Sequence, residues 1–481
     1  MTAFFAIVRL TCRSLVRSRV FQLLLAALFA TIVALPMTVV GDGTALAHIQ
    51  VSLKYSLGAV GMILSISAIW VGCSVMGEDV VSRRLHLVVA KPVSRWLVWF
   101  SKWAGVVVAH GVLLALAGGM VYALVLWRFD RSDFSKSEKE RIRGEILTGR
   151  AVFMPERPPI EELTRKELEK RLSRLSPDRS RGITSERREE LLWQVRKDVV
   201  ASLGGVPPGR TRLWRYTGLD PSGDSSIFLR YRVYVGKVDS SGQRGSKGMW
   251  LARVNLPAKS GAGKGDDGKK ESRTVFVPHS MYPEDIPCGS FAEMRMTPKV
   301  VFPDGSVVVG FTNYDPGRKP LFFQPKDGPK LLVEETGFLS NYLRALLVLF
   351  AKIAFLAGVA CAAGGLFSTP VAIFGVVSYI LAGSFSAYLL GVRDWIFESS
   401  GMAGKETLLD IVGNTLSEFL LLFIIPIQNF EVSGILSNGE LITWVLVAKI
   451  VLLDAVLRGA PLMALGAWLY SRRELGLVTG K

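Results

Sequence analysis

The sequence predicts an α-helical polytopic membrane protein with six transmembrane helices and an inserted extracytoplasmic α+β domain. The first observation is composition: 49% of the 481 residues are apolar and the mean hydropathy is +0.33, yet the net charge is +17 at pH 7. One soluble core rarely combines these values, and a disordered chain would be poor in apolar residues. The second observation is that long apolar runs fall into two groups, and the third is the charged interval that separates them.

Residues 1–19 predict a helix in the cytoplasmic interface of the membrane. At helical spacing Arg9, Arg13 and Arg17 share one face, and the apolar residues of the segment share another. A basic amphipathic pattern of this kind is typical of helices at a lipid surface. The alternative is that the arginines only flank the first span, as cytoplasmic basic residues commonly do.

Six apolar runs are long enough to cross about 30 Å of hydrocarbon, which takes roughly 20 helical residues. Three lie in residues 20–127 and three in residues 340–470. The runs are Val20 to Val40, Leu57 to Met76, Trp103 to Trp127, Ala345 to Phe367, Val371 to Leu390 and Ile442 to Tyr470. The first is too long for the apolar part of a cleaved signal peptide.

The distribution of lysine and arginine among the short loops predicts the orientation. Basic residues are frequent in residues 1–19, in residues 77–102 after the second span, and in the tail 471–481. The loop 391–440 is instead rich in acidic residues. Both termini should therefore be cytoplasmic, as an even number of spans requires.

Residues 128–336 form the charged interval and should lie outside the cytoplasm, because long domains cross the membrane regardless of charge. Residues 132–203 have a charged helical pattern, whereas residues 226–335 alternate β-branched and aromatic residues with polar ones. The expected strands cover 227–235, 249–254, 274–277, 300–302, 307–311 and 331–333. We expect a small β-sandwich with a helical insertion.

No motif for catalysis, metal binding or nucleotide binding stands out in the chain. The stretch Gly263–Lys270 approaches a P-loop, but Lys270 stands where a Mg-binding serine or threonine is required. The four histidines are isolated, and the four cysteines are too far apart in the chain for a CxxC metal site. We expect no cofactor, no metal and no nucleic acid on this chain.

Ionisable residues inside the expected spans are costly in hydrocarbon and therefore of functional interest. They are Lys352, Lys449, Asp454 and Arg458. Asp454 and Arg458 are four residues apart, so they share a helical face and can neutralise each other. Two interpretations stay open, a substrate pathway and an internal ion pair with snorkelling lysines.

Residues 404–430 predict a re-entrant or interfacial segment on the outer face. Its apolar run, Phe419 to Ile427, is too short to cross a bilayer, and Pro426 interrupts it. Residues 77–102 predict a cytoplasmic segment that docks into a partner. This segment begins with Glu78 and Asp79, continues with an apolar stretch that proline breaks, and ends at Lys102.

The order of features in residues 77–102 resembles that of ABC-2 type permeases, and most closely permeases grouped with copper-enzyme maturation transporters. The matching residues are Glu78 or Asp79, Lys91 through Arg95, and Lys102. Ser340-Asn341, the turn Ser368 to Ala372 and the closing Arg472 to Leu475 also agree. Two departures, Arg83-Arg84 and Ser101, stand where the family often has glycine-threonine and glycine. The resemblance covers the membrane half and not the insert.

The resemblance implies a permease subunit of an exporter in the bacterial plasma membrane, dimeric with its own copy or with a second permease. A separate ATPase chain would hold ATP and Mg, so this chain is not expected to be an enzyme. The residues implied in coupling to that ATPase are Glu78, Asp79, Lys91, Pro92, Arg95 and Lys102. Arg95 has an alternative role as an interfacial anchor. The resemblance also implies that residues 404–430 line the outer mouth.

Two rival functions stay open. In the first, the chain is a membrane-anchored scaffold or adaptor whose outer domain binds an envelope protein or polysaccharide. In the second, ATP hydrolysis moves the outer domain without any cargo crossing the membrane.

Overall fold

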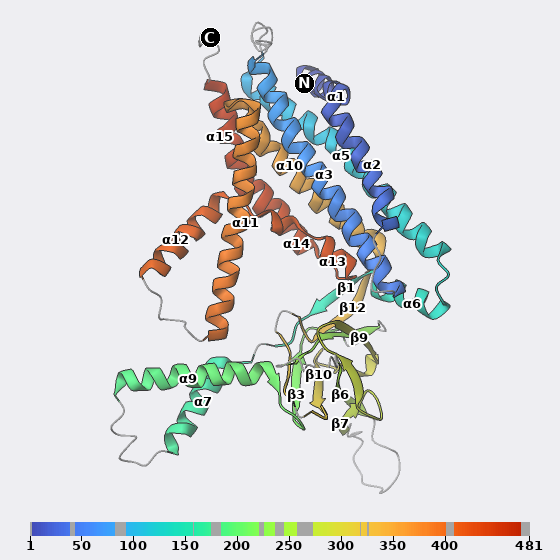
Figure 1. The fold of residues 1–481 in the computed structure, drawn as a ribbon, viewed down its shortest axis with the longest axis vertical. Coiled ribbons are helices and arrows are strands. Elements are labelled where there is room, and N and C mark those ends of the chain that lie inside the picture. The colour runs from blue at the N-terminus through green and yellow to red at the C-terminus, as the bar shows by residue number, and fades with distance from the viewer. Residues whose placement is uncertain are drawn as a thin grey trace. The chain divides into compact units, whose positions relative to one another are not determined.

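The computed structural model divides the chain into two compact units (Figure 1). The helical unit comprises Met1–Gly149, Thr336–Gly391 and Thr407–Lys481, and the sheet unit comprises Arg150–Glu335 with Val392–Glu406. The structure describes residues 2–38, 44–81, 93–156, 158–174, 184–220, 226–235, 245–256, 273–317, 319–324, 327–400 and 408–472. Residues 128–149, which the sequence assigns to the insert, belong to the helical unit.

The helical unit is built around α10, which is the most buried of its long helices. Helices α3, α5 and α15 pack against α10. In chain order the elements are α1 (Thr2–Arg17), α2 (Arg19–Thr38), α3 (Ala45–Val81), α5 (Arg95–Arg131), α6 (Lys136–Glu145), α10 (Phe338–Leu366), α11 (Thr369–Ser400), α12 (Leu408–Phe423), η2 (Ile427–Phe430), α13 (Ser433–Ser437), α14 (Trp444–Ala448), η3 (Lys449–Arg458) and α15 (Gly459–Arg472).

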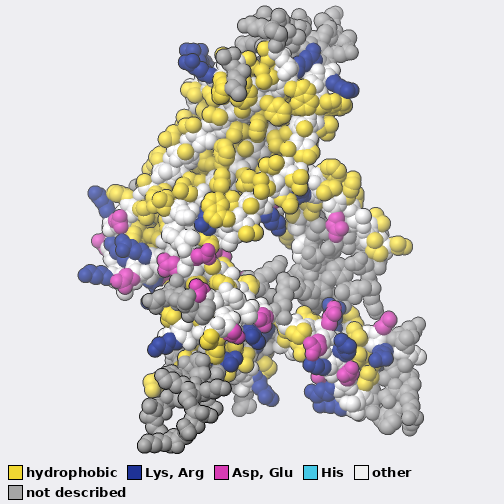
Figure 2. Space-filling view, turned by 180° about the vertical axis from the view of Figure 1, so that it is seen from behind, with side chains coloured by type: hydrophobic (Ala, Val, Ile, Leu, Met, Phe, Trp, Pro, Cys, Tyr) yellow, Lys and Arg dark blue, Asp and Glu magenta, His cyan; other side chains and the backbone are white. Residues whose placement is uncertain are grey.

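Within the described residues, four helices are long and apolar enough to cross a membrane: α3, α5, α10 and α11. Two bent pairs would raise the number to six if each counted as one span: α1 with α2, bent by 71°, and α12 with the segment through α13, bent by 49°. The predicted sixth run, Ile442 to Tyr470, is divided among α14, η3 and α15. Figure 2 shows that apolar side chains cover the visible face of this unit. The helices therefore permit membrane insertion.

Small residues bring α3 and α10 into close contact. A Cβ atom added to Gly72 would lie 2.7 Å from the Cβ of Ala360, and one added to Gly364 would lie 2.5 Å from the carbonyl oxygen of Cys73. Contacts of this kind let two helix backbones approach closely and increase their van der Waals packing. This pair forms the rigid centre of the helical unit.

Three contacts between distant residues define one end of the helical unit. Arg95 Nη1 donates to the carbonyl of Ser471 at 2.8 Å, and Lys102 Nζ donates to the carbonyl of Val75 at 3.0 Å. Cys12 Sγ donates to the carbonyl of Gly105 at 3.3 Å. The N-terminal helix, the last turns of α3 and α15 and the first turns of α5 therefore lie at the same end. The labels N and C also lie at this end in Figure 1.

The sheet unit packs two sheets on one apolar core. Strand orders are β1-β12-β4-β9 and β3-β10-β6-β7, with β8 also paired to β6, and a small third sheet is β2-β11-β5. Rings from both sheets meet in the core, where Tyr231 of β4 lies 4.7 Å from Trp250 of β6. The strands are β1 (Thr148–Phe153), β2 (Gly205–Val206), β3 (Thr211–Tyr216), β4 (Ile227–Arg232), β5 (Tyr234–Val235), β6 (Gly245–Leu256), β7 (Arg273–Pro278), β8 (Glu284–Pro287), β9 (Phe291–Met296), β10 (Val307–Asn313), β11 (Leu321–Phe322) and β12 (Lys330–Gly337).

Helices α7 (Ile160–Ser173) and α9 (Ser185–Gly204) form the helical part of this unit. They pack on each other through Leu168, Val195 and Val199. Two local expectations differ from the structure. The strand expected over 300–302 is not formed, because Pro298 begins a short 3-10 helix, Pro298–Val300, that takes up its first residue. The strand β1 interrupts the stretch expected to be helical.

A buried charge cluster ties three strands of the first sheet, with Arg150 in β1, Arg230 in β4 and Glu293 in β9. Glu293 of β9 accepts from Arg150 Nη1 at 2.9 Å and also from Arg230 Nε of β4. All three side chains are nearly inaccessible, and the guanidinium of Arg150 lies over the ring of Phe228. Burial of charges is tolerated here because opposite charges and hydrogen bonds meet in one place.

Candidate functional site

The candidate site is centred on a helix break in the helical unit, at residues 424–426. Helix α12 ends at Phe423 and η2 begins at Ile427. Pro426 lacks a backbone N–H and disfavours helical backbone in the residue before it, so the sequence itself interrupts the helix. An interruption frees backbone polar groups, and these groups need partners from elsewhere in the fold.

A tyrosine on α11 supplies partners for two of the freed groups. The hydroxyl of Tyr379 donates to the carbonyl of Phe423 at 3.0 Å and accepts from the amide of Ile425 at 3.1 Å. One side chain therefore satisfies a donor and an acceptor on either side of the break. No sequence signal distinguishes Tyr379 from other aromatic residues of the apolar run, and the sequence did not identify it.

An ion pair from the last helical segment lies beside the same break. Arg458 Nη1 donates to Asp454 Oδ1 at 2.9 Å, and Asp454 is only 3% exposed. Asn429 Nδ2 donates to Asp454 Oδ2 at 3.2 Å, and Arg458 Nε reaches the carbonyl of Leu422 at 3.4 Å. The predicted pairing of Asp454 with Arg458 is confirmed. Lys449, expected with them, is exposed and stands outside this cluster.

The ion pair belongs to a π-helix, η3, that spans ten residues. The amide of Gly459 bonds to the carbonyl of Asp454, five residues earlier, as a π-helical turn requires. Wider turns of this kind are uncommon inside helices and are frequent at functional sites. Pro461 follows in the first turn of α15.

Lys352 is the second buried cation near the break. It lies on α10, is 6% exposed, and makes no hydrogen bond or ion pair within the described part of the chain. The charged group that acts on it is the carboxylate of Glu431, which directly follows η2. Glu431 also accepts a hydrogen bond from the hydroxyl of Ser433. The break is therefore accompanied by two cations and two carboxylates from three segments: Lys352 of α10, Glu431 after η2, and Asp454 with Arg458 of η3.

The chain that follows α13 is held by buried polar residues at the start of α10. Asn341 Nδ2 donates to the carbonyl of Glu440 at 2.8 Å, and its Oδ1 accepts from the amide of Ile442 at 2.9 Å. Arg344 Nη1 donates to the carbonyl of Ile442 at 3.1 Å. Asn341 is fully buried, and this clamp was not expected from the sequence.

The residues expected to couple to an ATPase are only partly described. Glu78 and Asp79 lie in the last turn of α3, but their side chains, and the whole of Lys91 and Pro92, lie outside the described residues. Arg95 and Lys102 hold the carbonyls of Ser471 and Val75 and so join α5 to α15 and α3.

The arginines of α1 have the expected separation from the apolar face. Arg9, Arg13 and Arg17 are exposed, whereas Leu15 and Thr11 are buried. The contact face is set by Gly105 of α5, where an added Cβ would lie 2.8 Å from the Cβ of Thr11.

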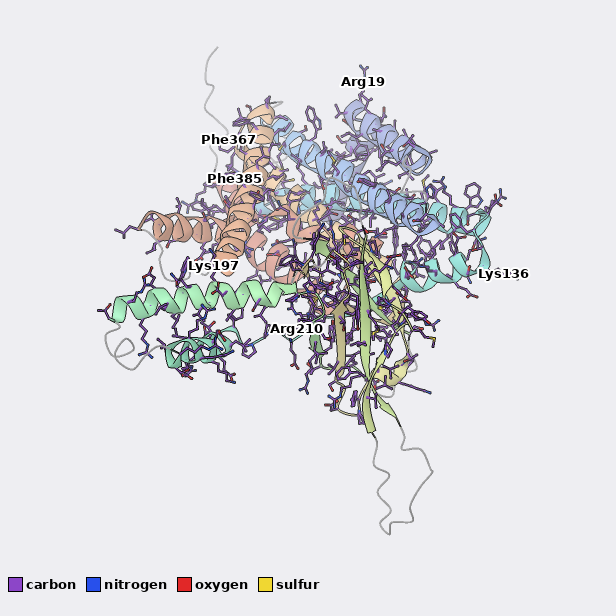
Figure 3. All side chains as sticks on the ribbon, turned by 60° about the horizontal axis from the view of Figure 1, so that its bottom comes forward. Arg19, Lys136, Lys197, Arg210, Phe367 and Phe385 are labelled. Atoms are coloured by element: carbon purple, nitrogen blue, oxygen red, sulfur yellow. The ribbon has the colours of Figure 1, made fainter. Side chains whose placement is uncertain are left out.

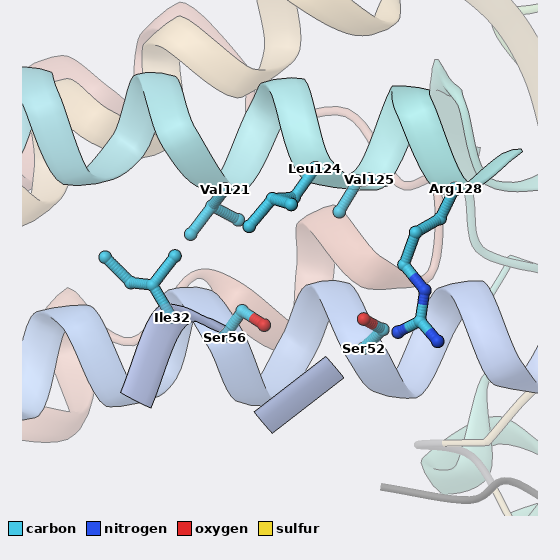
Figure 4. Close-up of a pocket in the computed structure, with 7 residues that line it drawn as sticks. All are labelled: Ile32, Ser52, Ser56, Val121, Leu124, Val125 and Arg128. Atoms are coloured by element: carbon cyan, nitrogen blue, oxygen red, sulfur yellow. The ribbon is translucent and has the colours of Figure 1, made fainter. Parts of the chain in front are cut away.

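A narrow crevice lies between α2, α3 and α5 (Figure 4). It is lined by Ile32, Ser52, Ser56, Val121, Leu124, Val125 and Arg128. The crevice has no room for a water molecule, so it does not qualify as a small-molecule site. Among the described residues, no group of three or more histidine, cysteine, aspartate or glutamate side chains is placed to hold a metal ion. The P-loop-like stretch Gly263–Lys270 lies outside them.

No protein-family model, curated protein sequence or solved structure matches the chain.

Proposed function

We propose that the chain is the membrane permease subunit of an ATP-driven exporter of the ABC-2 type, coupled to a separate ATPase and dimeric with its own copy or a second permease. The observation that carries the proposal is the polar cluster at a broken helix inside an apolar bundle. Transporters place substrate sites at discontinuous helices between spans, where unwound backbone and buried ionisable groups meet. A protein that was only anchored would have no use for such costly groups.

The contacts at the chain-terminal end offer a route from an ATPase to this cluster. The segment between α3 and α5 contains Lys91 and Pro92, and Arg95 directly follows it. Arg95 binds the last turn of α15, and α15 continues directly from the π-helix that carries Asp454 and Arg458. Displacement of the segment by a closing ATPase would therefore pull on the helix that holds the break. This works only if the ATPase binds two positions of the segment with different affinity.

The same contacts support an orientation in the bacterial plasma membrane. Helix α1, the first turns of α5 and the last turn of α15 lie at one end of the helical unit, and the basic residues of these segments assign that end to the cytoplasm by the positive-inside rule. The insert leaves and rejoins this unit at Gly149 and Thr336, beside Asn341 at the opposite end. In this arrangement the sheet unit is extracytoplasmic and is available to an envelope protein. ATP and Mg would be held by the partner ATPase.

Co-purification tests the coupling segment. The full chain is isolated from native membranes with Glu78→Gln and Lys91→Ala combined, and we expect a strong loss of a Walker-motif ATPase from the complex. Arg9→Gln is the matched control, because Arg9 is an exposed charge at the same end of the molecule and lies outside the segment. Unchanged capture of the ATPase by the double variant removes the coupling assignment.

The rival scaffold function is favoured by one observation, the separate core of the sheet unit. It predicts capture of an envelope protein or polysaccharide with no ATPase in the complex. The mechanical alternative predicts an ATPase in the complex and no cargo movement in vesicles. An ATPase gene beside this one would favour both ATP-driven functions over the scaffold.

A further inference from the structure

The sheet of β3, β10, β6 and β7 has β3 at one edge and β7 at the other (Figure 1). An edge strand presents unpaired backbone N–H and C=O groups, and natural proteins usually protect them with charged side chains or proline. We propose that β7 is a dimerisation edge, at which the β7 strands of two copies of this chain pair antiparallel about a two-fold axis. The inference concerns the sheet unit and requires neither transport nor an ATPase partner.

The bonding between β6 and β7 determines which backbone groups of β7 point to the open side. The amide of His279, directly after β7, donates to the carbonyl of Trp250 of β6 at 2.9 Å. Bonding sides alternate along an antiparallel strand, so the odd-numbered residues of β7 face β6. The N–H and C=O groups of Thr274 and Phe276 therefore point to the open side. Among the strands that the structure describes, β7 pairs only with β6.

The charges along this edge leave one short stretch unprotected. The nitrogen of Pro278 faces the open side, so its missing N–H removes no bond to β6. Strand β8, which pairs with β6 next to β7, carries Glu284 and Asp285 and ends at Pro287. The stretch Thr274–Pro278 carries no charge. The open groups of β7 therefore lie on an uncharged segment between two protected positions.

The opposite edge of the same sheet is charged. Arg210 directly precedes β3 and is labelled in Figure 3, and Arg212 and Arg215 lie within the strand. Two β3 strands brought together would place like charges against each other, which is destabilising in a sheet. The two edges of this sheet therefore differ, and only β7 has a composition that permits the addition of a further strand.

Side chains on both faces of β7 are apolar and exposed. Phe276, on the outer face, is 42% exposed, and Val277, on the core face, is 38% exposed. The core face is identified by Val254 of β6, which lies opposite Val275 and belongs to the sandwich core. A valine on the core face that stays exposed shows that the facing sheet does not cover β7. A strand beyond β7 would remove this apolar surface from water, at about 25 cal/mol per Å².

The sequence of β7 identifies a second copy as the added strand. With Phe276 on the two-fold axis, antiparallel pairing puts Phe276 opposite its counterpart and Val275 opposite Val277 of the second copy. Aromatic and β-branched cross-strand pairs of this kind stabilise sheets. The next pair joins Thr274 to Pro278. The segment is therefore self-complementary, as a two-fold interface between identical chains requires.

The backbone groups match in the same register. Both open-side groups of Phe276 would bond to those of Phe276 in the second copy, and the amide of Thr274 would donate to the carbonyl of Pro278. The prolines lie at the two ends of the paired segment, where the carbonyl of Thr274 stays accessible to water. Centring the pair one residue earlier would place Arg273 opposite Val277, a charge against an apolar side chain.

A pair of short strands is marginally stable by itself in water. Two copies in one membrane are confined together, and the resulting effective concentration favours a weak contact without any further interaction. The helical unit permits such insertion. The pairing should therefore be tested on the full chain in its membrane.

Cysteine cross-linking in native membranes tests the pairing. On the two-fold axis the Cα atoms of residue 276 would lie about 5.5 Å apart, within the range of about 4.4–6.8 Å that a disulfide spans. We expect Phe276→Cys to link to itself under copper phenanthroline. The background for all variants is the full chain with its free cysteines replaced by alanine, at Cys12, Cys73, Cys288 and Cys361.

Two further variants fix the direction and register of the strands. Residue 274 would lie about 14 Å from its own counterpart at strand rise, so Thr274→Cys and Pro278→Cys should each stay monomeric. Co-expressed with different tags, these two variants should link to each other. Leu213→Cys is the matched control, because Leu213 is an exposed apolar residue on the opposite edge strand, and it should not link.

Three results would overturn the inference. Absence of a link at Phe276→Cys means that β7 does not pair with itself. Self-linking of Thr274→Cys and Pro278→Cys means a parallel or irregular approach. Equal linking of Leu213→Cys and Phe276→Cys means random collision of the outer units. The proposed function is judged separately: ATPase capture without a link at Phe276→Cys leaves it standing, and a link without ATPase capture supports only the strand pairing.

A proline variant tests whether the contact is a strand pair. Phe276→Pro removes the open-side N–H without removing a bond to β6, and we expect several-fold less linking between Thr274→Cys and Pro278→Cys. Phe276→Thr is the matched control, since it keeps the N–H and a β-branched side chain, and it should keep most of the linking. Equal losses in both variants would mean that a loose contact of the Phe276 rings, and no backbone pairing, joins the copies.

Discussion

At the residue scale, the stability of the helical unit depends on a few buried charged side chains. Asp454 is almost inaccessible, and its carboxylate is satisfied by Arg458 and Asn429. A buried carboxylate that loses its cation remains an uncompensated charge, and this is far more costly than the pair itself. The cluster at the break is therefore sensitive to single substitutions.

Arg458→Met should strongly destabilise the helical unit. The substitution leaves Asp454 without its cation and removes the donor to the carbonyl of Leu422, so we expect a loss of about 3 kcal/mol or more in the free energy of unfolding. Unfolding of the full chain in mixed micelles by SDS titration measures this loss. Lys449→Met is the matched control and should have little effect, because Lys449 is exposed on the same helical segment. Similar losses in both variants would contradict the assignment.

In the sheet unit, Glu293 is the buried carboxylate whose loss should be most costly, because two buried arginines face it. Glu293→Gln removes the charge that Arg150 and Arg230 both face, and we expect about 3–5 kcal/mol less protection of the β4 and β9 amides against hydrogen exchange. Glu190→Gln, in an exposed pair with Arg187, should leave these amides unchanged. Unaltered protection in Glu293→Gln would show that the arginines are held by other groups.

At the scale of one element, hydrogen bonds at a helix end can make the stability of the helix depend on pH. Helix α6 begins with a capping box, in which Ser135 accepts from the amide of Glu138 and the carboxylate of Glu138 accepts from the amide of Ser135. The carboxylate also accepts from the Ser135 hydroxyl, and this bond, followed by the one from the Ser135 amide, lowers the pKa of Glu138 below its ordinary value of 4.5. The stabilisation is therefore complete above pH 4.5 and is lost as pH falls through the lowered pKa.

The first turn of α6 should accordingly lose protection in acid. Hydrogen exchange of its amides, corrected for the intrinsic effect of pH, should accelerate between pH 5 and the lowered pKa of Glu138. Glu138→Gln should remove most of this dependence, since glutamine keeps the hydrogen bond without titrating. If the variant keeps the wild-type profile, another acidic group controls the turn.

Elements could be predicted from the sequence where the pattern that specifies them lies within one continuous segment. Long apolar runs predicted the helices, and i,i+4 spacing predicted the pairing of Asp454 with Arg458. Tyr379 could not be predicted, because its partner at Ile425 is 46 residues away and apolar runs commonly contain tyrosine. The clamp that Asn341 makes was missed because its partners, Glu440 and Ile442, are 99 and 101 residues away. The π-helix depends on packing that no local pattern encodes. The strand β1 was missed because charged residues that favour helices surround it.

The number of membrane crossings sets the topology at the scale of the whole molecule. The proposed permease has six crossings, of which α3, α5, α10 and α11 are each long and apolar enough by themselves. The other two would be α2 and the segment from α14 to α15. An even number places both termini on one side, in agreement with the contacts among α1, α5 and α15. If the pair of α12 and the segment through α13 crossed as well, the seventh crossing would separate the termini.

Protease protection tests this parity. In sealed inside-out vesicles, tags at both termini should be digested while the insert, residues 150–335, stays intact. Right-side-out spheroplasts should give the reverse pattern. Digestion of the insert together with both termini in one preparation would contradict the six-crossing arrangement and the extracytoplasmic placement of the sheet unit.

The lengths of α3 and α5 have a consequence for any bilayer that holds them. Each helix has 37 residues and therefore extends for about 55 Å, more than the roughly 40–45 Å of a bilayer with its headgroups. In a membrane, each helix must therefore tilt or project beyond the headgroups by about two turns.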